Sequence, residues 1–317
     1  MRRPTILAPV IAIGAIAVTA ATVLSGCGFT HPPAAAASPG PARASLPVRA
    51  DHYLGIYEPA SPGSYGSIIN FGRTMGFQPN LALYYSAWFE RFRLNFARAA
   101  HLHGAVPLVQ IDPNNVSMGS IASGKYDSYL RSYADQVRSY AHPVVIGFAH
   151  EANGPWFSWG WTHVPPATWV AAWRHIVTIF RGAGADNVTW LWTVNRDGNN
   201  TGPLHDYWPG STYVTWIGID GYYEVPFDDF PNIFGPTIAA IRRFSHRPVL
   251  VSETAAGEAA GQAAKIPDLF AGAKASGVLG FVWFDASQSN GQHHQDWRIE
   301  GNAPSVEAFR QGLKSFH

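Results

Sequence analysis

Eight short apolar runs, separated by helix-like segments, dominate the sequence from residue 51 onward. They lack the strict alternation of a strand with one wet face, and this is typical of parallel strands covered on both sides. In chain order the runs are 53–57, 81–85, 106–111, 144–149, 188–194, 214–219, 248–251 and 278–284. Eight such strands alternating with helices predict an α/β fold, the (β/α)8 barrel, with a doubly wound open sheet as the main alternative.

Six amphipathic segments are the expected helices of this fold: 90–101, 126–140, 166–180, 233–244, 259–275 and 304–313. Pro165-Pro166 fits the start of the third. Residues 196–213 carry only a weak helical pattern. No glycine-rich phosphate fingerprint follows any apolar run, which disfavours a nucleotide-binding open sheet.

The first residues have the features of an export signal. Basic Met1-Arg2-Arg3 precedes an apolar stretch, 6–23, and then Leu24-Ser25-Gly26-Cys27. These four residues resemble a bacterial lipobox, in which the cysteine becomes the lipidated first residue of the mature protein. We therefore expect a lipoprotein signal peptide over 1–26 and lipidation at Cys27. A plain signal peptide, or a single membrane anchor with an incidental cysteine, is the alternative.

Residues 27–50 are rich in proline and alanine and have no periodic apolar face, so we expect an extended tether. The first 50 residues contain four arginines and no acid. Residues 51–317 therefore carry 18 basic and 21 acidic groups, a net charge of −3. Their number, 267, suits one (β/α)8 catalytic domain.

Composition excludes several classes of protein. A hydrophobic fraction of 47% is too high for a disordered chain, and a net charge of +1 lacks the basic field that nucleic-acid binding needs. A single cysteine excludes an internal disulfide framework. The 12 tryptophans suit a protein that binds the flat faces of sugars. We expect a monomer without metal or cofactor, whose partners are a polysaccharide and, through the lipid anchor, a membrane.

Polar and aromatic side chains stand where the predicted strands end. A barrel places its active site at those ends, so these side chains should converge. They are His150, Glu151, Trp156, Asn195, Asp220, Tyr222, Glu253 and Trp283. Glu151 and Glu253 end the fourth and seventh strands, on opposite sides of the barrel opening. Glycoside cleavage needs one carboxylic acid to protonate the leaving oxygen and one carboxylate to attack or to activate water. The alternative for either glutamate alone is a capping or ion-pair role.

The segment 148–159, Phe-Ala-His-Glu-Ala-Asn-Gly-Pro-Trp-Phe-Ser-Trp, resembles the acid/base motif of glycoside hydrolase family 26. The segment 248–254, Pro-Val-Leu-Val-Ser-Glu-Thr, resembles its nucleophile strand, and the resemblance runs from about 52 to 312. That family includes β-mannanases and β-1,3-1,4-glucanases and works with retention on a (β/α)8 barrel. His150, before the motif glutamate, is a position at which many relatives have asparagine.

The resemblance implies roles for the residues. Glu151 is the proton donor and later the base, and Glu253 is the nucleophile. His150 hydrogen-bonds near the nucleophile or the sugar at the cleavage point, and Tyr222 orients Glu253. Trp156 and Trp283 stack on sugars. Asn195 and Asp220 are weaker substrate-binding candidates, and Asp220 fits equally well as a hydrogen-bond acceptor that stabilises the opening.

Some residues stay ambiguous. Trp159 and Trp161 fit either sugar subsites or a local core that holds their loop. His293-His294 suggest a metal, but no carboxylate spacing supports a site. Gln110 and Asp112, at the end of the third strand, are candidates to line the opening.

Three classes of function remain. The first is a lipid-anchored retaining β-glycanase acting on β-1,4-mannan, with mixed-linkage β-glucan or β-1,3-xylan as alternatives. The second is a non-catalytic carbohydrate-binding surface lipoprotein. The third is an unrelated barrel enzyme that uses the same opening for metal or phosphate chemistry.

Overall fold

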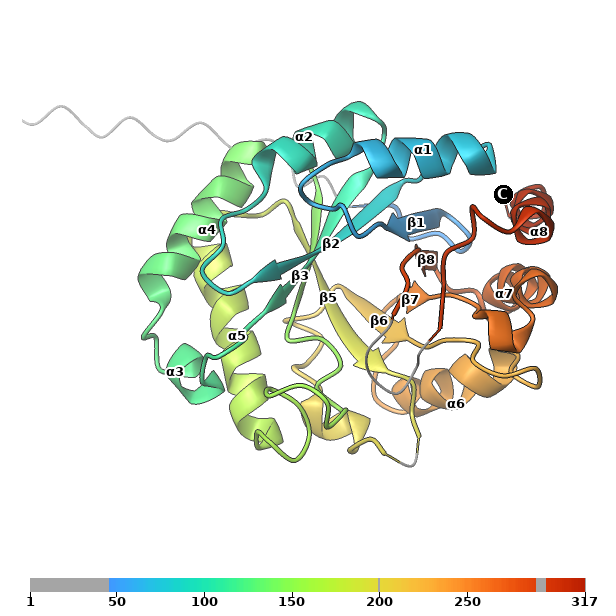
Figure 1. Ribbon diagram of the computed structural model, residues 1–317. Helices are drawn as coiled ribbons and strands as arrows, with labels where there is room; N and C mark the ends of the chain where they lie inside the picture. Colours follow the sequence, from blue (N-terminus) through green and yellow to red (C-terminus); the bar gives the residue numbers. More distant parts are fainter. Residues whose placement is uncertain (1–45, 199, 289–294, 317) are drawn as a thin grey trace, which may run out of the picture. The chain divides into compact units, whose positions relative to one another are not determined.

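The eight apolar runs form the parallel strands of a closed barrel, in which neighbours in sequence are neighbours in space and β1 pairs with β8 (Figure 1). The computed structural model describes residues 46–198, 200–288 and 295–316. The strands are β1 (Tyr53–Tyr57), β2 (Leu81–Ala87), β3 (Val106–Asp112), β4 (Val144–Phe148), β5 (Val188–Asn195), β6 (Trp216–Asp220), β7 (Val249–Thr254) and β8 (Gly280–Phe284). The expected (β/α)8 barrel is therefore confirmed, and the open sheet is excluded.

Helices follow the strands and form the outer layer. They are α1 (Gly66–Met75), α2 (Leu94–Leu102), α3 (Met118–Ala122), α4 (Asp127–Tyr140), α5 (Pro166–Gly182), α6 (Phe230–Arg242), α7 (Gln262–Ser276) and α8 (Ala303–Leu313). Two short 3-10 turns, η1 (Leu204–Tyr207) and η2 (Glu258–Ala260), lie in the loops after β5 and β7. The six expected helices are present, with ends shifted by up to four residues, whereas α1 and α3 were not expected.

The shifted and missing helices have local causes. The α6 helix begins at Phe230 because the Asp229 side chain accepts from the Asn232 amide, an N-cap bond of 2.8 Å, and a proline occupies the first turn. The glycine-rich stretch before and within α1 conceals its buried stripe of Ile68, Phe71 and Met75.

The barrel interior is filled in layers by alternate residues of the strands, as the two-residue period of a strand requires. The lower layers are apolar and include Leu83, Leu108, Leu191 and Leu250, each at most 1% exposed. The layer above is polar. There the Gln110 amide donates to the Thr193 hydroxyl at 2.9 Å.

This polar layer depends on a missing side chain. A Cβ on Gly147 would lie 1.9 Å from Oε1 of Gln110, so β4 makes room for this amide only because it has no side chain there. The layer forms a hydrogen-bonded floor beneath the mouth of the barrel, which consists of the carboxyl ends of the strands and the loops that follow them.

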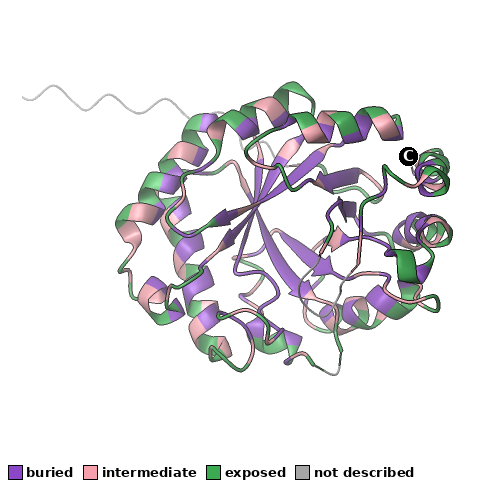
Figure 2. Cartoon of the chain, viewed as in Figure 1, coloured by how far each residue is buried: buried purple, intermediate pink, exposed green. Residues whose placement is uncertain are grey.

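The burial of the side chains follows the arrangement of strands and helices. Figure 2 shows buried strands at the centre and helices whose outer faces are exposed. None of the helices in the described part of the chain is both long and apolar enough to span a membrane. Residues 46–50, which the sequence assigns to the tether, contact the barrel: Leu46 packs against its lower core, and the Tyr53 hydroxyl donates to the Pro47 carbonyl at 2.9 Å.

Candidate active site

Glu151 lies in a tight turn directly after β4, and the turn has strained backbone. Ala149 and Glu151 have φ values of 47° and 52°, in the left-handed region that residues other than glycine seldom adopt. Three hydrogen bonds hold this conformation. The Ala149 amide donates to Ile111 of β3, the Glu151 amide to Thr193 of β5, each at 3.0 Å, and the Trp159 indole to the His150 carbonyl at 2.8 Å. Such a conformation costs about 1–3 kcal/mol per residue, so it persists only because the surrounding structure holds it.

Two neutral donors hold the carboxylate of Glu151. The Asn195 amide donates to Oε1 at 2.7 Å, and the Trp156 indole donates to Oε2 at 2.6 Å. Glu151 is 8% exposed, whereas Trp156 is 46% exposed and presents much of its ring to solvent. The ring lies against Gly154, where a Cβ would come within 2.1 Å of it, so glycine is needed at that position.

Asn153 positions one of these donors. Its side-chain amide donates to the Asn195 carbonyl and its side-chain oxygen accepts from the Asn195 amide, both at 2.9 Å. Asn153 is fully buried. The sequence motif contains Asn153 but does not indicate a role for it, because a side chain that acts through another residue's backbone has no separate sequence signature.

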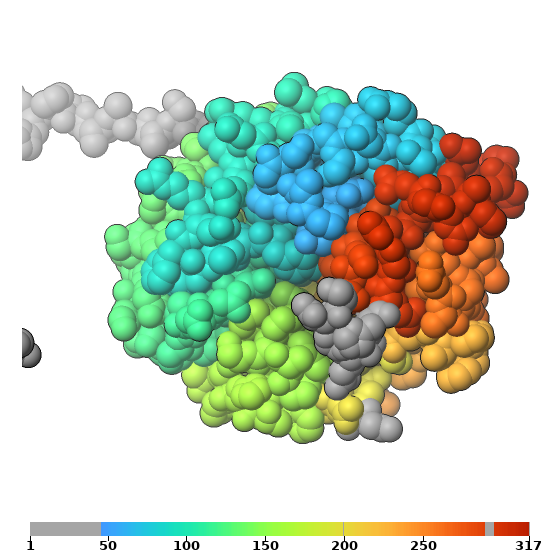
Figure 3. Space-filling view, in the orientation of Figure 1, coloured from blue at the N-terminus to red at the C-terminus, as the bar shows by residue number. Residues whose placement is uncertain are grey.

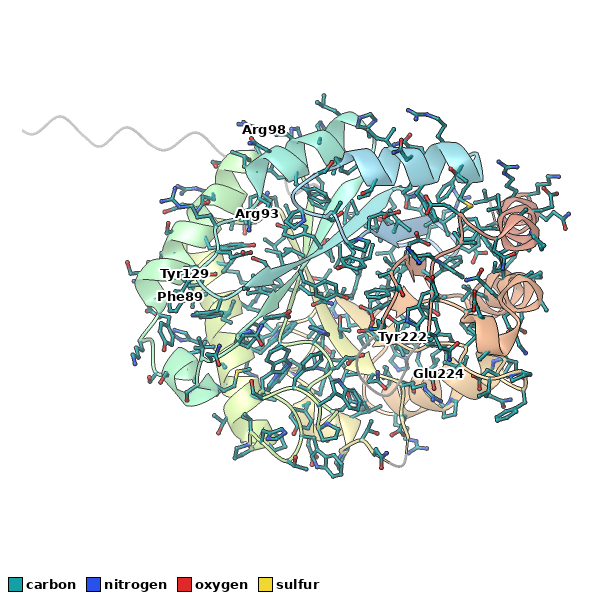
Figure 4. The ribbon with its side chains drawn as sticks, in the orientation of Figure 1. Phe89, Arg93, Arg98, Tyr129, Tyr222 and Glu224 are labelled. Carbon is teal, nitrogen blue, oxygen red and sulfur yellow. The ribbon has the colours of Figure 1, made fainter. Side chains whose placement is uncertain are left out.

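Glu253, on β7, is held by two tyrosines. The Tyr222 hydroxyl donates to Oε1, and the Tyr85 hydroxyl donates to Oε2. Tyr222 lies on the loop after β6, which also carries Glu224 (Figure 4), and its ring packs 4.6 Å from that of Trp297. Burial, then the charge of Glu253, raises the pKa of both phenols well above the ordinary value, so both remain donors.

Tyr222 was expected to orient Glu253, but Tyr85 was missed as a site residue. The period of β2 could have found it. Leu81 and Leu83 face the barrel interior, so Tyr85 faces the interior one step nearer the mouth.

The ionisation of Glu253 reflects opposing influences. Burial and the negative charge of Glu151 raise its pKa to about 7, while the two tyrosine hydrogen bonds and the positive charge of His150 lower it. Burial and the neighbouring charge outweigh the hydrogen bonds, so Glu253 titrates close to neutral pH.

His150 is buried in the mouth and pairs with Asp112, with Nδ1 3.1 Å from the Asp112 carboxylate. Burial lowers the pKa of His150, but the charge of Asp112 and a hydrogen bond to it, together with the charges of Glu151 and Glu253, outweigh burial and raise it to about 9. The ring lies between Phe157, at 4.8 Å, and Tyr85, at 5.5 Å. His150 is therefore a fixed positive charge beside the two glutamates at neutral pH.

Asp220 lies at the centre of the same group. It pairs in register with Glu253, is 1% exposed, and accepts from the Ser252 hydroxyl at 2.6 Å. Burial, followed by the charges of Glu253 and Glu151, raises the pKa of Asp220 well above its ordinary value. A protonated Asp220 is a donor to Glu151, with which it shares a hydrogen bond.

The expectation that Trp283 stacks on a sugar is wrong. Its side chain is fully buried, donates at 3.2 Å to Asp285 and to the Trp297 carbonyl, and packs against Phe309 of α8. The reason is the strand period: Val282 faces the barrel interior, so Trp283 points outward into the helix layer.

The ambiguous tryptophan Trp159 belongs to a local core. It is 2% exposed and stacks on Phe157 at 4.4 Å, beneath the turn that carries Glu151. Cys27 and His293-His294 lie outside the described residues. In the described part of the chain, the group of carboxylates with metal-like spacing is Glu58, Asp285 and Glu300, at the β1 and β8 side of the barrel.

A closed (β/α)8 barrel with two hydrogen-bonded glutamates at the ends of β4 and β7 defines a class of protein, the glycoside hydrolase barrels. The chain belongs to glycosyl hydrolase family 26, whose family model matches residues 116–299. The matched segment contains both glutamates.

Relatives agree with this membership. Endoglucanase H of Acetivibrio thermocellus is 28% identical over 294 residues, which cover 82% of this chain and 32% of that protein. A mannan endo-1,4-beta-mannosidase of Bacillus subtilis is 27% identical over 126 residues, which cover 36% of this chain and 34% of the relative. The alignments thus span only about a third of each relative's length.

Solved structures support the fold. The modular endo-beta-1,4-mannanase of Cellulomonas fimi superimposes with a TM-score of 0.63 at 16% identity, over 84% of this chain and 71% of the other. This likeness concerns the barrel architecture alone.

Proposed function

We propose that the barrel hydrolyses a β-linked polysaccharide with retention of configuration, with Glu253 as nucleophile and Glu151 as acid and base. The observation that carries the proposal is the different set of donors on the two carboxylates. Glu253 receives two phenol hydrogen bonds and lies near the positive His150, both of which favour its ionised form. Glu151 accepts instead from the Asn195 amide and from the indole of the half-exposed Trp156, so it lies on the solvent side of the pair, where a leaving group departs.

The reaction follows from these roles. An oxygen of Glu253 attacks the anomeric carbon while Glu151 gives its proton to the departing glycosidic oxygen, which leaves as an alcohol. Glu151, now a carboxylate, then takes a proton from water, whose oxygen displaces Glu253 from the same carbon. The two inversions give net retention. This route requires the two carboxyl groups about 5–5.5 Å apart.

Trp156 and Asn195 keep Glu151 aimed at the glycosidic oxygen, and the exposed face of Trp156 is a platform for the sugar beyond it. His150 and Asp220 contribute charge and a proton to the group. We assign no substrate contact to Trp283.

For the polymer we propose β-1,4-mannan, the substrate in the name of the Bacillus subtilis relative. A β-glucan is the second candidate, because the alignment with Endoglucanase H covers 82% of this chain. The test is release of reducing ends from mannan, glucomannan, mixed-linkage glucan and β-1,3-xylan, with Glu151→Ala as control. Release from one polymer that is lost in the variant supports the proposal. Binding without release, in the wild type, would favour a carbohydrate-binding lipoprotein instead.

We also propose that the chain is exported and anchored through a lipid on Cys27, on the strength of the lipobox-like Leu24-Ser25-Gly26-Cys27. Cells given a radiolabelled fatty acid should incorporate the label into the wild type and not into Cys27→Ser. A wild type without label would instead favour a plain signal peptide or a spanning anchor.

A further inference from the structure

Three carboxylates from distant parts of the chain meet where the barrel closes. Glu58 directly follows β1, Asp285 directly follows β8, and Glu300 lies on the segment that leads into α8. One oxygen of each lies within 4.8 Å of the other two. Figure 3 shows the chain around β1, in blue, beside the C-terminal segment, in red.

The three side chains differ in their contacts. Asp285 is 2% exposed, and its Oδ1 accepts from the Ile299 amide at 3.0 Å and from the Trp283 indole at 3.2 Å. Both bonds end on Oδ1 and hold that oxygen in place. Glu300 is exposed and gives access from solvent.

Glu58 is the unusual member. Glu58 is 8% exposed, and within the described residues no donor reaches its carboxylate, which faces the negative charge of Glu300. A buried carboxylate without a donor costs several kcal/mol unless it is protonated or binds a cation. Its oxygen is aimed at those of Asp285 and Glu300.

The negative charge of the three carboxylates is not neutralised by the arginine that lies near them. Arg298 lies near Asp285 and Glu300, but its guanidinium is committed to Asp296 through two bonds of 2.8 and 2.6 Å and is open to solvent. Burial and the neighbouring carboxylates raise the pKa of Glu58 to about 7 and that of Asp285 to about 9. The group therefore attracts either protons or a metal.

We propose that Glu58, Asp285 and Glu300 form a binding site for Ca²⁺. A calcium ion takes six to eight oxygen ligands at about 2.3–2.6 Å, so two ligands on opposite sides are about 5 Å apart. Oxygens no more than 4.8 Å apart can all contact one such ion. The site offers carboxylates without histidine or cysteine, which is the ligand set of a hard cation. Water completes the coordination through the open side at Glu300.

The ion would tie the ends of the first and last strands to the segment before α8. Directly below, Tyr57 of β1 stacks on Phe284 of β8 at 4.6 Å, and the Asp285 amide donates to the Tyr57 carbonyl at 3.0 Å. Calcium should thus stabilise the closure of the barrel, and its effect should appear in stability before it appears in turnover.

The test is calorimetric titration of the chelator-treated full chain with CaCl2. We expect one ion per chain, and a melting temperature raised by roughly 3–8 °C at a hundredfold excess over Kd. Glu58→Gln should weaken binding at least about tenfold, because it removes a charged ligand and keeps the shape. The matched control is Asp135→Asn, on the surface of α4, where Asp135 pairs with Arg138.

Asp285→Asn is the second variant, since asparagine still accepts the Ile299 and Trp283 hydrogen bonds. Circular dichroism in chelator establishes that both variants are folded. If the wild type shows no saturable binding, or if both variants bind as the wild type does, the proposal is wrong and the three carboxyls share protons instead.

Discussion

Glu151 and Glu253 belong to the same mouth, yet the chain surrounds them with different chemistry. Glu151 follows a strained turn and accepts from an amide and an indole. Glu253 lies on β7, where the register with β6 and β8 shifts, and accepts from two phenols beside a charged histidine. The two phenols and the positive charge of His150 favour the ionised form of Glu253, which an attacking carboxylate requires. Glu151 instead accepts from the indole of the half-exposed Trp156, on the solvent side where a leaving group departs. This difference is the basis for proposing Glu253 as the attacking group and Glu151 as the acid.

Removing the attacking group should have the largest effect. Glu253→Ala should lower kcat on every β-glycan by at least about 10⁴-fold, because the covalent step has no substitute. Added azide should restore turnover of an aryl glycoside by direct displacement, giving the α-glycosyl azide, identified by NMR. Glu307→Ala on α8 is the matched surface control. Azide product of the β configuration would reverse the two assignments.

Glu151→Ala should have a smaller effect that depends on the substrate. We expect a loss of about 10²–10⁴-fold on polysaccharide, whose leaving oxygen needs a proton, and little loss of the first step with a dinitrophenyl glycoside. Azide should now capture the glycosyl-enzyme and give the β-glycosyl azide. Equal losses with both leaving groups would show that Glu151 does not act as the acid.

The tyrosines should control the acidic limb of the pH profile. Glu253 attacks only when ionised, so with a pKa of about 7 the value of kcat/KM should fall as pH drops below 7. The Tyr85 hydrogen bond lowers this pKa, so Tyr85→Phe should raise it and move the limb to higher pH. We expect about one unit, since a hydrogen bond to a charged group contributes about 1.5 kcal/mol or more.

Tyr126→Phe, at the periphery, is the control for this shift. A limb that stays in place in Tyr85→Phe would mean that another group controls the acidic side, and the contrast between the two glutamates would lose its electrostatic basis.

Much of this arrangement could be predicted from the sequence, and the errors have physical causes. Eight buried parallel strands need apolar runs, and those runs are visible at 53–57 and 278–284 as at every strand between them. The placement of both glutamates follows from the strand ends. When both faces of a strand are apolar, the sequence does not show which face points into the barrel. For this reason the sequence predicts Trp283 at the mouth, although it faces the helices.

Contacts between segments that are distant in the sequence were the second feature that the sequence did not predict. Tyr85 reaches Glu253 across the barrel, and Glu58 meets Asp285 and Glu300 only because β1 closes on β8. Each of these residues looks ordinary in its own segment. Loop structure was equally hidden: the helix expected from residue 90 begins at Leu94, after a turn in which Phe89 adopts a φ of 72° and lies beside Tyr129 at the periphery (Figure 4).

The two tryptophans give the smallest effects on turnover and the clearest test of inward and outward faces. Trp156→Phe keeps a ring but removes one of the two donors to Glu151, so kcat should fall by roughly fivefold to tenfold, the equivalent of one hydrogen bond, with little change in melting temperature. Trp283→Phe should lower stability and leave substrate binding unchanged. It removes the indole donor to the Trp297 carbonyl and opens a void against Phe309, so the free energy of unfolding should fall by about 1–3 kcal/mol while KM stays unchanged. Melting curves and steady-state kinetics on the same preparations separate the two outcomes. A raised KM in Trp283→Phe without loss of stability would mean that β8 turns the face that carries Trp283, and not the face that carries Val282, towards the sugar.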